Sequence, residues 1–229
     1  MVMILNIETS TDVCSVALSE NGVTVSHLEI YDGNAHAANL TPLIERIFAS
    51  QSDVKIADIE AVAVSSGPGS YTGLRIGAST AKGICYALGK PLIAVPTLDI
   101  IDEAIFLSDS KIDIACPMID ARRMEVYTQV VRRNAEVIVP VEALVVDENA
   151  FANELSANVI AFGGNGAAKC QKVITSANAV FVPDICPLAS NMARLAQKKF
   201  DAREFESVAY FEPFYLKEFI ATVPKNKVF

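Results

Sequence analysis

The chain has 229 residues, of which 52% are hydrophobic and 20% are charged. This length suffices for one large domain or two small ones, and the composition excludes a disordered chain. With 27 acidic and 19 basic residues, the formal net charge is −8. A protein of this charge repels nucleic acid phosphates, so we do not expect it to hold RNA tightly alone.

The cysteines and the apolar runs indicate a cytoplasmic protein. The five cysteines lie far apart with no Cys-x-x-Cys spacing, which favours a reducing compartment. The N-terminus lacks a basic leader, and no apolar run reaches the roughly 18 to 20 residues that a membrane span needs.

The first half of the chain predicts three strands followed by alternating helices and strands. β-Branched runs separated by turn residues predict strands over 3–8, 13–19 and 23–30. Apolar residues at helical spacing predict a helix over 35–50, where Pro42 would fit the first turn or mark a kink. A strand over 59–64, a helix over 73–88, a strand over 91–95 and a helix from Thr97 to about Leu107 follow, with Thr97 as N-cap.

The second half repeats this order. Strands are predicted over 114–119, 125–132 and 136–139, then a helix over 147–155, a strand over 158–164, a helix over 167–175, a strand over 179–183 and a helix over 188–199. Each half therefore follows the order βββαβαβα. We infer an α/β fold of two stacked domains with mixed sheets, over 1–106 and 107–229. By analogy, this duplicated unit is that of the actin-like (ASKHA) ATPase superfamily.

The stretch SSGPGSYTGLRIG, from Ser65 to Gly77, matches no standard phosphate loop or nucleophile elbow. The Walker A and dinucleotide patterns both fail, as does Gly-x-Ser-x-Gly. A small nest of backbone N–H groups over 67–72 remains an alternative for anion binding.

Small residues recur every four positions along the helix that follows this stretch. Interior glycines each cost about 1 kcal/mol relative to alanine, so something must offset them. The stripe permits close approach of another backbone, either from the same chain or from a partner. Its members are Gly69, Gly73, Gly77, Ala81 and Cys85.

Four segments resemble the TsaB (YeaZ) family. They are SSGPGSYTGLRIGASTAKGICYALGKPLIAVPTLD, the opening ILNIETSTDVCSVAL, DARRMEVY over 120–127, and EPFYLK over 212–217. The resemblance runs nearly end to end, and its long glycine motif is specific.

The resemblance implies a non-catalytic scaffold or dimerisation subunit in tRNA threonylcarbamoyladenosine biosynthesis. It implies pairing with a catalytic TsaD-like relative through the helices over 35–50 and 73–88, a TsaE-like ATPase in the assembly, and contact with tRNA only through the complex. The expected interface comprises the small-residue stripe with Leu40, Leu43, Ile47 and Leu74. We also expect a homodimer when the chain is alone.

The residues do not predict a metal site. His27 and His36 are the two histidines, and Leu40 stands where a second ligand after His36 would fall.

An independent actin-like nucleotide-binding protein, acting as an ATPase or phosphotransferase, is the alternative. No cofactor other than a nucleotide is expected. Weak nucleotide binding at a vestigial site would use residues from three segments. These are Glu8, Thr9 and Ser10 in the first turn, Asp120 in the second, and Gly163 and Gly164. Arg122 and Arg123 depart from the pattern, because a glycine usually follows the second-turn acid. They form a basic pair that could contact RNA or a partner's acids, or could be solvated and balanced by Glu125.

Overall fold

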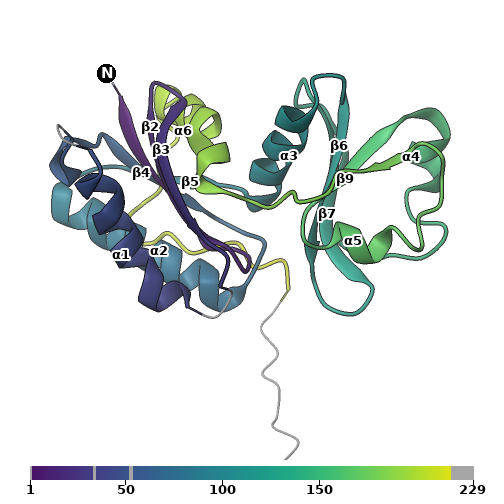
Figure 1. The fold of residues 1–229 in the computed structure, drawn as a ribbon, viewed down its shortest axis with the longest axis horizontal. Coiled ribbons are helices and arrows are strands. Elements are labelled where there is room, and N and C mark those ends of the chain that lie inside the picture. The colour runs from purple at the N-terminus through teal and green to yellow at the C-terminus, as the bar shows by residue number, and fades with distance from the viewer. Residues whose placement is uncertain (1, 33–34, 52–53, 218–229) are drawn as a thin grey trace, which may run out of the picture.

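Two five-stranded mixed sheets, each covered by helices, form the molecule in this computed structural model (Figure 1). The structure describes residues 2–32, 35–51 and 54–217. The first sheet has the order β3-β2-β1-β4-β5 and the second the order β10-β9-β6-β7-β8, which is the same topology. The predicted order βββαβαβα occurs twice.

The bounds of the elements agree with the prediction in the first half. They are β1 (Met3–Glu8), β2 (Cys14–Glu20), β3 (Val23–Ile30), α1 (His36–Ala49), η1 (Ile56–Asp58), β4 (Ala61–Ser65), α2 (Tyr71–Leu88), β5 (Leu92–Val95) and α3 (Thr97–Ser108). Two details differ. Pro42 lies well inside α1 rather than in its first turn, and Pro96 rather than Thr97 occupies the N-cap of α3.

The second half contains the predicted elements with larger shifts. They are β6 (Ile114–Asp120), β7 (Glu125–Arg132), β8 (Val137–Val145), α4 (Ala152–Ala157), β9 (Ile160–Gly163), α5 (Ala167–Cys170), β10 (Ala179–Phe181), η2 (Ala189–Met192) and α6 (Ala193–Asp201). The edge strand β8 extends beyond its predicted end, while α4 and α5 are shorter than predicted.

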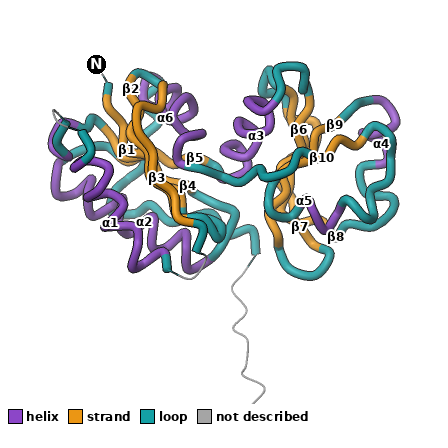
Figure 2. The backbone as a smooth tube through the Cα atoms, in the orientation of Figure 1, coloured by secondary structure: helices purple, strands orange, loops and turns teal. Residues whose placement is uncertain are grey.

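The helices α3 and α6 each pack on the sheet of the other half. α3 comes from the first half but packs through Leu98, Ile101 and Ile105 on the second sheet. α6 comes from the second half but packs through Ala196 on the first sheet, where Ile4 and Ile93 lie. Both helices therefore lie between the sheets, as Figure 2 shows. Residues 1–106, expected as one domain, contain the first sheet and most of α3, whereas residues 107–229 contain the second sheet and α6.

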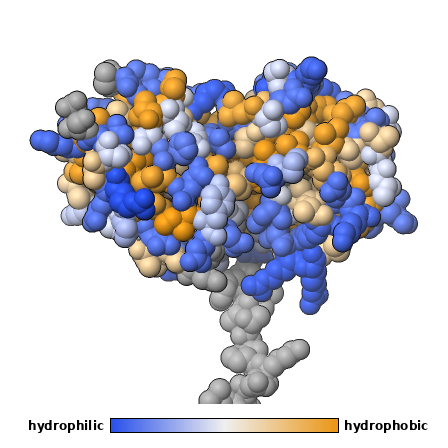
Figure 3. Space-filling model, in the orientation of Figure 1, coloured by the Kyte–Doolittle hydropathy of each residue, from blue (hydrophilic) through white to orange (hydrophobic). Residues whose placement is uncertain are grey.

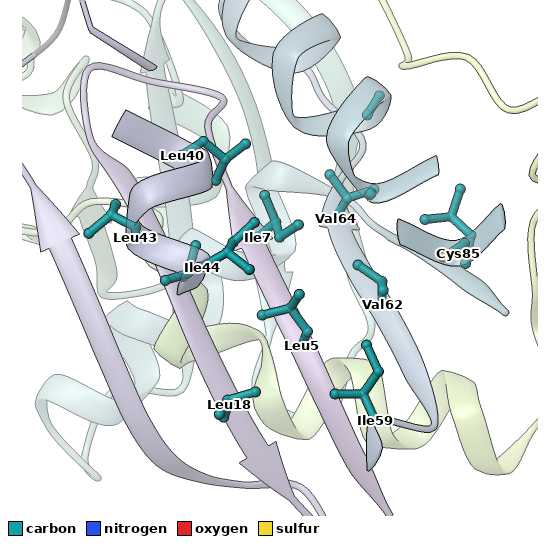
Figure 4. Packing of buried hydrophobic residues seen from close by; sticks show 14 of the residues in the cluster. Leu5, Ile7, Leu18, Leu40, Leu43, Ile44, Ile59, Val62, Val64 and Cys85 are labelled. Atoms are coloured by element: carbon teal, nitrogen blue, oxygen red, sulfur yellow. The ribbon is translucent and has the colours of Figure 1, made fainter. Parts of the chain in front are cut away.

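The largest core lies between the first sheet and the helices α1 and α2. Figure 4 shows Leu40 and Leu43 of α1 above Leu5 and Ile7 of β1, and all four belong to one buried cluster. Strands buried on both faces read as continuous apolar runs, which explains the sequence of β1 and β4.

The chain after α6 crosses the first half as a strap over residues 204–217. Glu206 N donates to Leu92 O at 2.9 Å, and Phe211 is buried in the core of the first half. Lys82 Nζ donates to Ala209 O at 3.2 Å and to Phe211 O at 3.0 Å. The strap thus extends the edge of the first sheet and then passes along α2.

Candidate functional site

The small-residue stripe of α2 faces the first turn of the same chain. A Cβ at Gly73 would lie 2.0 Å from Thr9 O, and one at Gly77 would lie 2.3 Å from Thr9 Oγ1. A Cβ at Gly69 would lie 2.4 Å from Ser10 O. The glycines are needed because α2 approaches the backbone of its own chain, and Thr9 Oγ1 donates to Gly73 O at 2.8 Å there.

This orientation corrects the interface predicted from the sequence. Apart from the half-buried Gly69, the predicted interface residues are buried inside the first half, so their side chains are closed to a partner. They are Leu40, Leu43, Ile47, Gly73, Leu74, Gly77, Ala81 and Cys85. The small size of the glycines serves packing within the chain, which is the alternative left open by the sequence.

The opposite face of α2 is exposed and also carries small residues. Gly83 lies on it, and a Cβ there would meet no atom within 4 Å. Ser79 is exposed one turn earlier. Nothing within the described chain requires a glycine at position 83. A groove of about 510 Å³ follows this face and is lined by Ala37, Tyr71, Thr72, Arg75, Ile76, Ser79 and Thr80. The sequence prediction missed this surface. Ser79 and Gly83 are nevertheless four residues apart, which is the same spacing as in the buried stripe.

The first turn is buried and built around Glu8. Ser10 N donates to Glu8 Oε1, while Glu8 Oε2 has no hydrogen-bond partner of good geometry among the residues that the structure describes. Burial raises the pKa of this carboxyl from 4.5 to about 7, and the hydrogen bond from Ser10 opposes this shift only in part. Ser10 O in turn accepts from Ser70 N at 2.7 Å. The turn therefore fixes the start of α2. The Glu8 side chain is buried under the turn and is closed to solvent.

A cleft of about 580 Å³ separates the two halves beside this turn. Its walls come from both halves and from the end of the strap: residues 10–12, 68–72, 119–122 and 215–217, with Tyr127 and Asn165. The rings of Tyr71 and Tyr215 lie 4.8 Å apart at the cleft. The structure thus brings Ser10 and Asp120 to one cleft, as the predicted vestigial site requires.

Gly163 and Gly164 do not line this cleft. A Cβ at Gly163 would lie 2.8 Å from Ile105 Cγ1, and one at Gly164 would lie 2.3 Å from Met118 O. Both glycines let the chain pack against α3 and β6. The structure therefore does not bring these two glycines to the cleft that contains Ser10 and Asp120.

Arg122 and Arg123 form the tip of the hairpin between β6 and β7. Both are exposed, and their φ angles of 73° and 49° place two successive arginines in the left-handed region. Arg122 N donates to Asp120 Oδ1 at 2.8 Å, which fixes the start of this turn. Arg122 also lines the cleft.

Asp120 and Glu125, the acids beside this pair, form ion pairs with lysines. Lys169 Nζ contacts Asp120 Oδ1 and donates to Glu125 O at 2.7 Å. Lys217, at the end of the strap, forms an ion pair with Glu125. Glu125 therefore does not balance the arginines, contrary to the alternative considered from the sequence. No pattern in the sequence indicates these lysine partners, which lie 49 and 92 residues from the acids.

The histidines lie apart. His36 is buried, with Nε2 at 2.7 Å from Thr11 O, whereas His27 lies in β3 beside Glu29. Over the described ranges, no group of three or more His, Cys, Asp or Glu residues is placed to hold a metal ion. None of the described helices combines the length and apolar character needed to cross a bilayer.

Comparisons with known proteins agree over most of the chain. A family model described as "TsaD: tRNA N6-adenosine threonylcarbamoyltransferase" matches residues 32–225. The chain is 30% identical over 226 residues to the tRNA threonylcarbamoyladenosine biosynthesis protein TsaB of Haemophilus influenzae, covering 93% of each chain.

Solved structures confirm the predicted fold. The chain resembles YeaZ from Pseudomonas aeruginosa with a TM-score of 0.82 and 25% identity, over 94% of this chain and 100% of that one. An activator of 2-hydroxyisocaproyl-CoA dehydratase from Clostridium difficile, solved with bound ADPNP, shares the fold at a TM-score of 0.52 and 9% identity, over 88% of this chain and 96% of that one. The duplicated α/β arrangement is thus that of actin-like proteins.

Proposed function

Because the chain belongs to the TsaB (YeaZ) family of tRNA threonylcarbamoyladenosine biosynthesis, we propose that it is the non-catalytic subunit that binds a TsaD-like threonylcarbamoyltransferase. In this role the chain supports a partner that catalyses the transfer reaction. A TsaE-like ATPase joins the assembly, and tRNA is reached through the complex.

The exposed face of α2, with the adjoining groove that Ala37 of α1 helps to line, is the surface that we assign to the partner. The observation that carries this assignment is Gly83, an exposed glycine inside an 18-residue helix with no neighbour of its own chain to accommodate. Such a glycine costs about 1 kcal/mol relative to alanine. Close approach of a partner helix would offset this cost. The adjoining groove offers room for the partner's side chains.

Burial of this face would act on the partner by ordering it. A subunit shifts a conformational equilibrium only through contacts that favour one state of its partner. The same face would support a homodimer when the chain is alone, since a two-fold dimer uses one self-complementary surface.

Co-purification with the TsaD-like transferase of the same organism tests the proposal. Ser79→Arg places a long charged side chain on the exposed face of α2 and should abolish or strongly weaken pairing. Ser156→Arg is the matched control, because Ser156 is an exposed serine of α4 on the second half. Equal recovery of the transferase with both variants would count against this interface.

The alternative role, an independent nucleotide-binding protein, is favoured by one observation: the cleft between the halves. Calorimetry of the isolated chain with ATP and Mg²⁺ tests it. Micromolar affinity accompanied by turnover would replace the scaffold proposal with this one.

A further inference from the structure

The tip of the β6–β7 hairpin presents two arginines in a conformation that is unfavourable for them. Non-glycine residues in the left-handed region are strained, and such strain persists only where the surrounding structure imposes it. Here Asp120 Oδ1 accepts from Arg122 N at 2.8 Å, and Ala121 N donates to Glu125 O at 3.1 Å. Asparagine or glycine would adopt this backbone at lower cost.

The positive charge of the pair is not neutralised locally. Asp120 and Glu125, the acids that begin and end the turn, are paired with Lys169 and Lys217. The side chains of Arg122 and Arg123 form no ion pair or hydrogen bond with any part of the chain that the structure describes. Four basic and two acidic side chains therefore leave a local excess of two positive charges, on a chain whose net charge is −8.

We propose that Arg122 and Arg123 bind backbone phosphates of the tRNA substrate, an inference that rests on the proposed function. A guanidinium group donates two parallel hydrogen bonds to a phosphate, which a solvated lysine does not do. Phosphate contacts of this kind position an RNA without reading its sequence. An acidic subunit needs such a local cationic point if it is to approach RNA within a complex.

The position of the pair favours an extended polyanion over a free nucleotide. Both side chains are exposed at a hairpin tip rather than enclosed in a pocket. Arg122 also lines the adjoining cleft, whereas Arg123 is not among the residues that line it. Ile105 and Met118 fill the space beside Gly163 and Gly164. Figure 3 shows hydrophilic residues along the lower edge of the second half.

The experiment measures binding of a tRNA transcript to the complex of this chain with its transferase. Arg122→Gln/Arg123→Gln should weaken binding about tenfold or more and reduce the slope of log K against log salt concentration by roughly two. Arg203→Gln is the control, because Arg203 is also exposed with a φ of 57° but lies at the end of α6. It should leave affinity within a factor of two.

A second variant separates binding from folding. Arg122→Asn/Arg123→Gly removes the charges and relieves the backbone, so its melting temperature should rise by a few degrees while its tRNA affinity falls. Unchanged tRNA affinity in both double variants would overturn the assignment. So would a loss confined to ATP binding by the isolated chain, because the ligand would then be a nucleotide.

Complex formation is measured separately by size-exclusion chromatography. A wild-type chain that fails to bind the transferase contradicts the proposed function and overturns this inference with it. A complex that forms normally, and binds tRNA equally with and without the two arginines, overturns the hairpin assignment alone.

Discussion

Arg194 of α6 and Glu103 of α3 form a two-pronged ion pair between the helices that exchange sheets. Arg194 Nε donates to Glu103 Oε1 at 2.8 Å, and Arg194 Nη2 contacts Glu103 Oε2. The Glu103 side chain is only 10% exposed, whereas that of Arg194 is 65% exposed. Each helix comes from one half and packs on the sheet of the other. The pair therefore fixes the contact between the halves.

Loss of this pair should destabilise the fold. Arg194→Ala leaves the nearly buried Glu103 carboxylate unpaired, so we expect the free energy of unfolding to fall by about 1 to 2 kcal/mol, less than for a fully buried pair because solvent screens Arg194. Urea denaturation measures the change. Arg203→Ala, an exposed control, should stay within about 0.5 kcal/mol of the wild type. Equal stability of the two variants would contradict a role for the pair.

Two glycines of α2 should respond in opposite directions to alanine. Gly73→Ala forces a Cβ to within 2.0 Å of Thr9 O, so α2 must shift and stability should fall by about 3 kcal/mol. Gly83→Ala meets open space and should raise stability by about 1 kcal/mol. Thermal and urea unfolding of both variants check this. Destabilisation by Gly83→Ala would show that its exposed environment is described wrongly.

Glu8 should make stability depend on pH. Its pKa is about 7 in the folded chain against 4.5 without burial. Between these values the folded chain keeps a proton that the unfolded chain releases, so stability falls as pH rises through this window, by about 3 kcal/mol in total. Glu8→Gln cannot ionise, so its stability relative to the wild type should increase from pH 4.5 to pH 8.

Urea unfolding of both proteins at a series of pH values measures this difference, since the remaining titrating groups are common to both. A difference that does not vary with pH would mean that Glu8 is ionised in the folded chain.

The strap should be anchored by Phe211 rather than by Phe214. Phe211 is 8% exposed and packs in the core of the first half, whereas Phe214 is 50% exposed. Phe211→Ala should therefore cost about 3 kcal/mol, and Phe214→Ala less than about 1 kcal/mol. Limited proteolysis of the native proteins gives a second measurement, because a released strap should be cut faster in the Phe211 variant. The reverse ranking would place the anchor at Phe214.

The order of elements could be read from the sequence because it is a local property. Apolar periodicity and turn residues place β1, β2 and β3 to within a residue of their observed bounds. The duplicated pattern then predicted two sheets of one topology. Short elements of the second half, such as α4 and α5, were placed less well because few residues contribute to each pattern.

Contacts between distant residues required the tertiary structure. A stripe of small residues indicates that something lies close, but its spacing does not distinguish Thr9 of the same chain from a partner, and here Thr9 fills that place. The exchange of α3 and α6 depends on which apolar faces fit together. Whether nearby acids neutralise Arg122 and Arg123 is decided by Lys169 and Lys217, which pair with Asp120 and Glu125 from 49 and 92 residues away. Periodicity records which side chains are apolar, small or charged, whereas only the folded chain selects their neighbours.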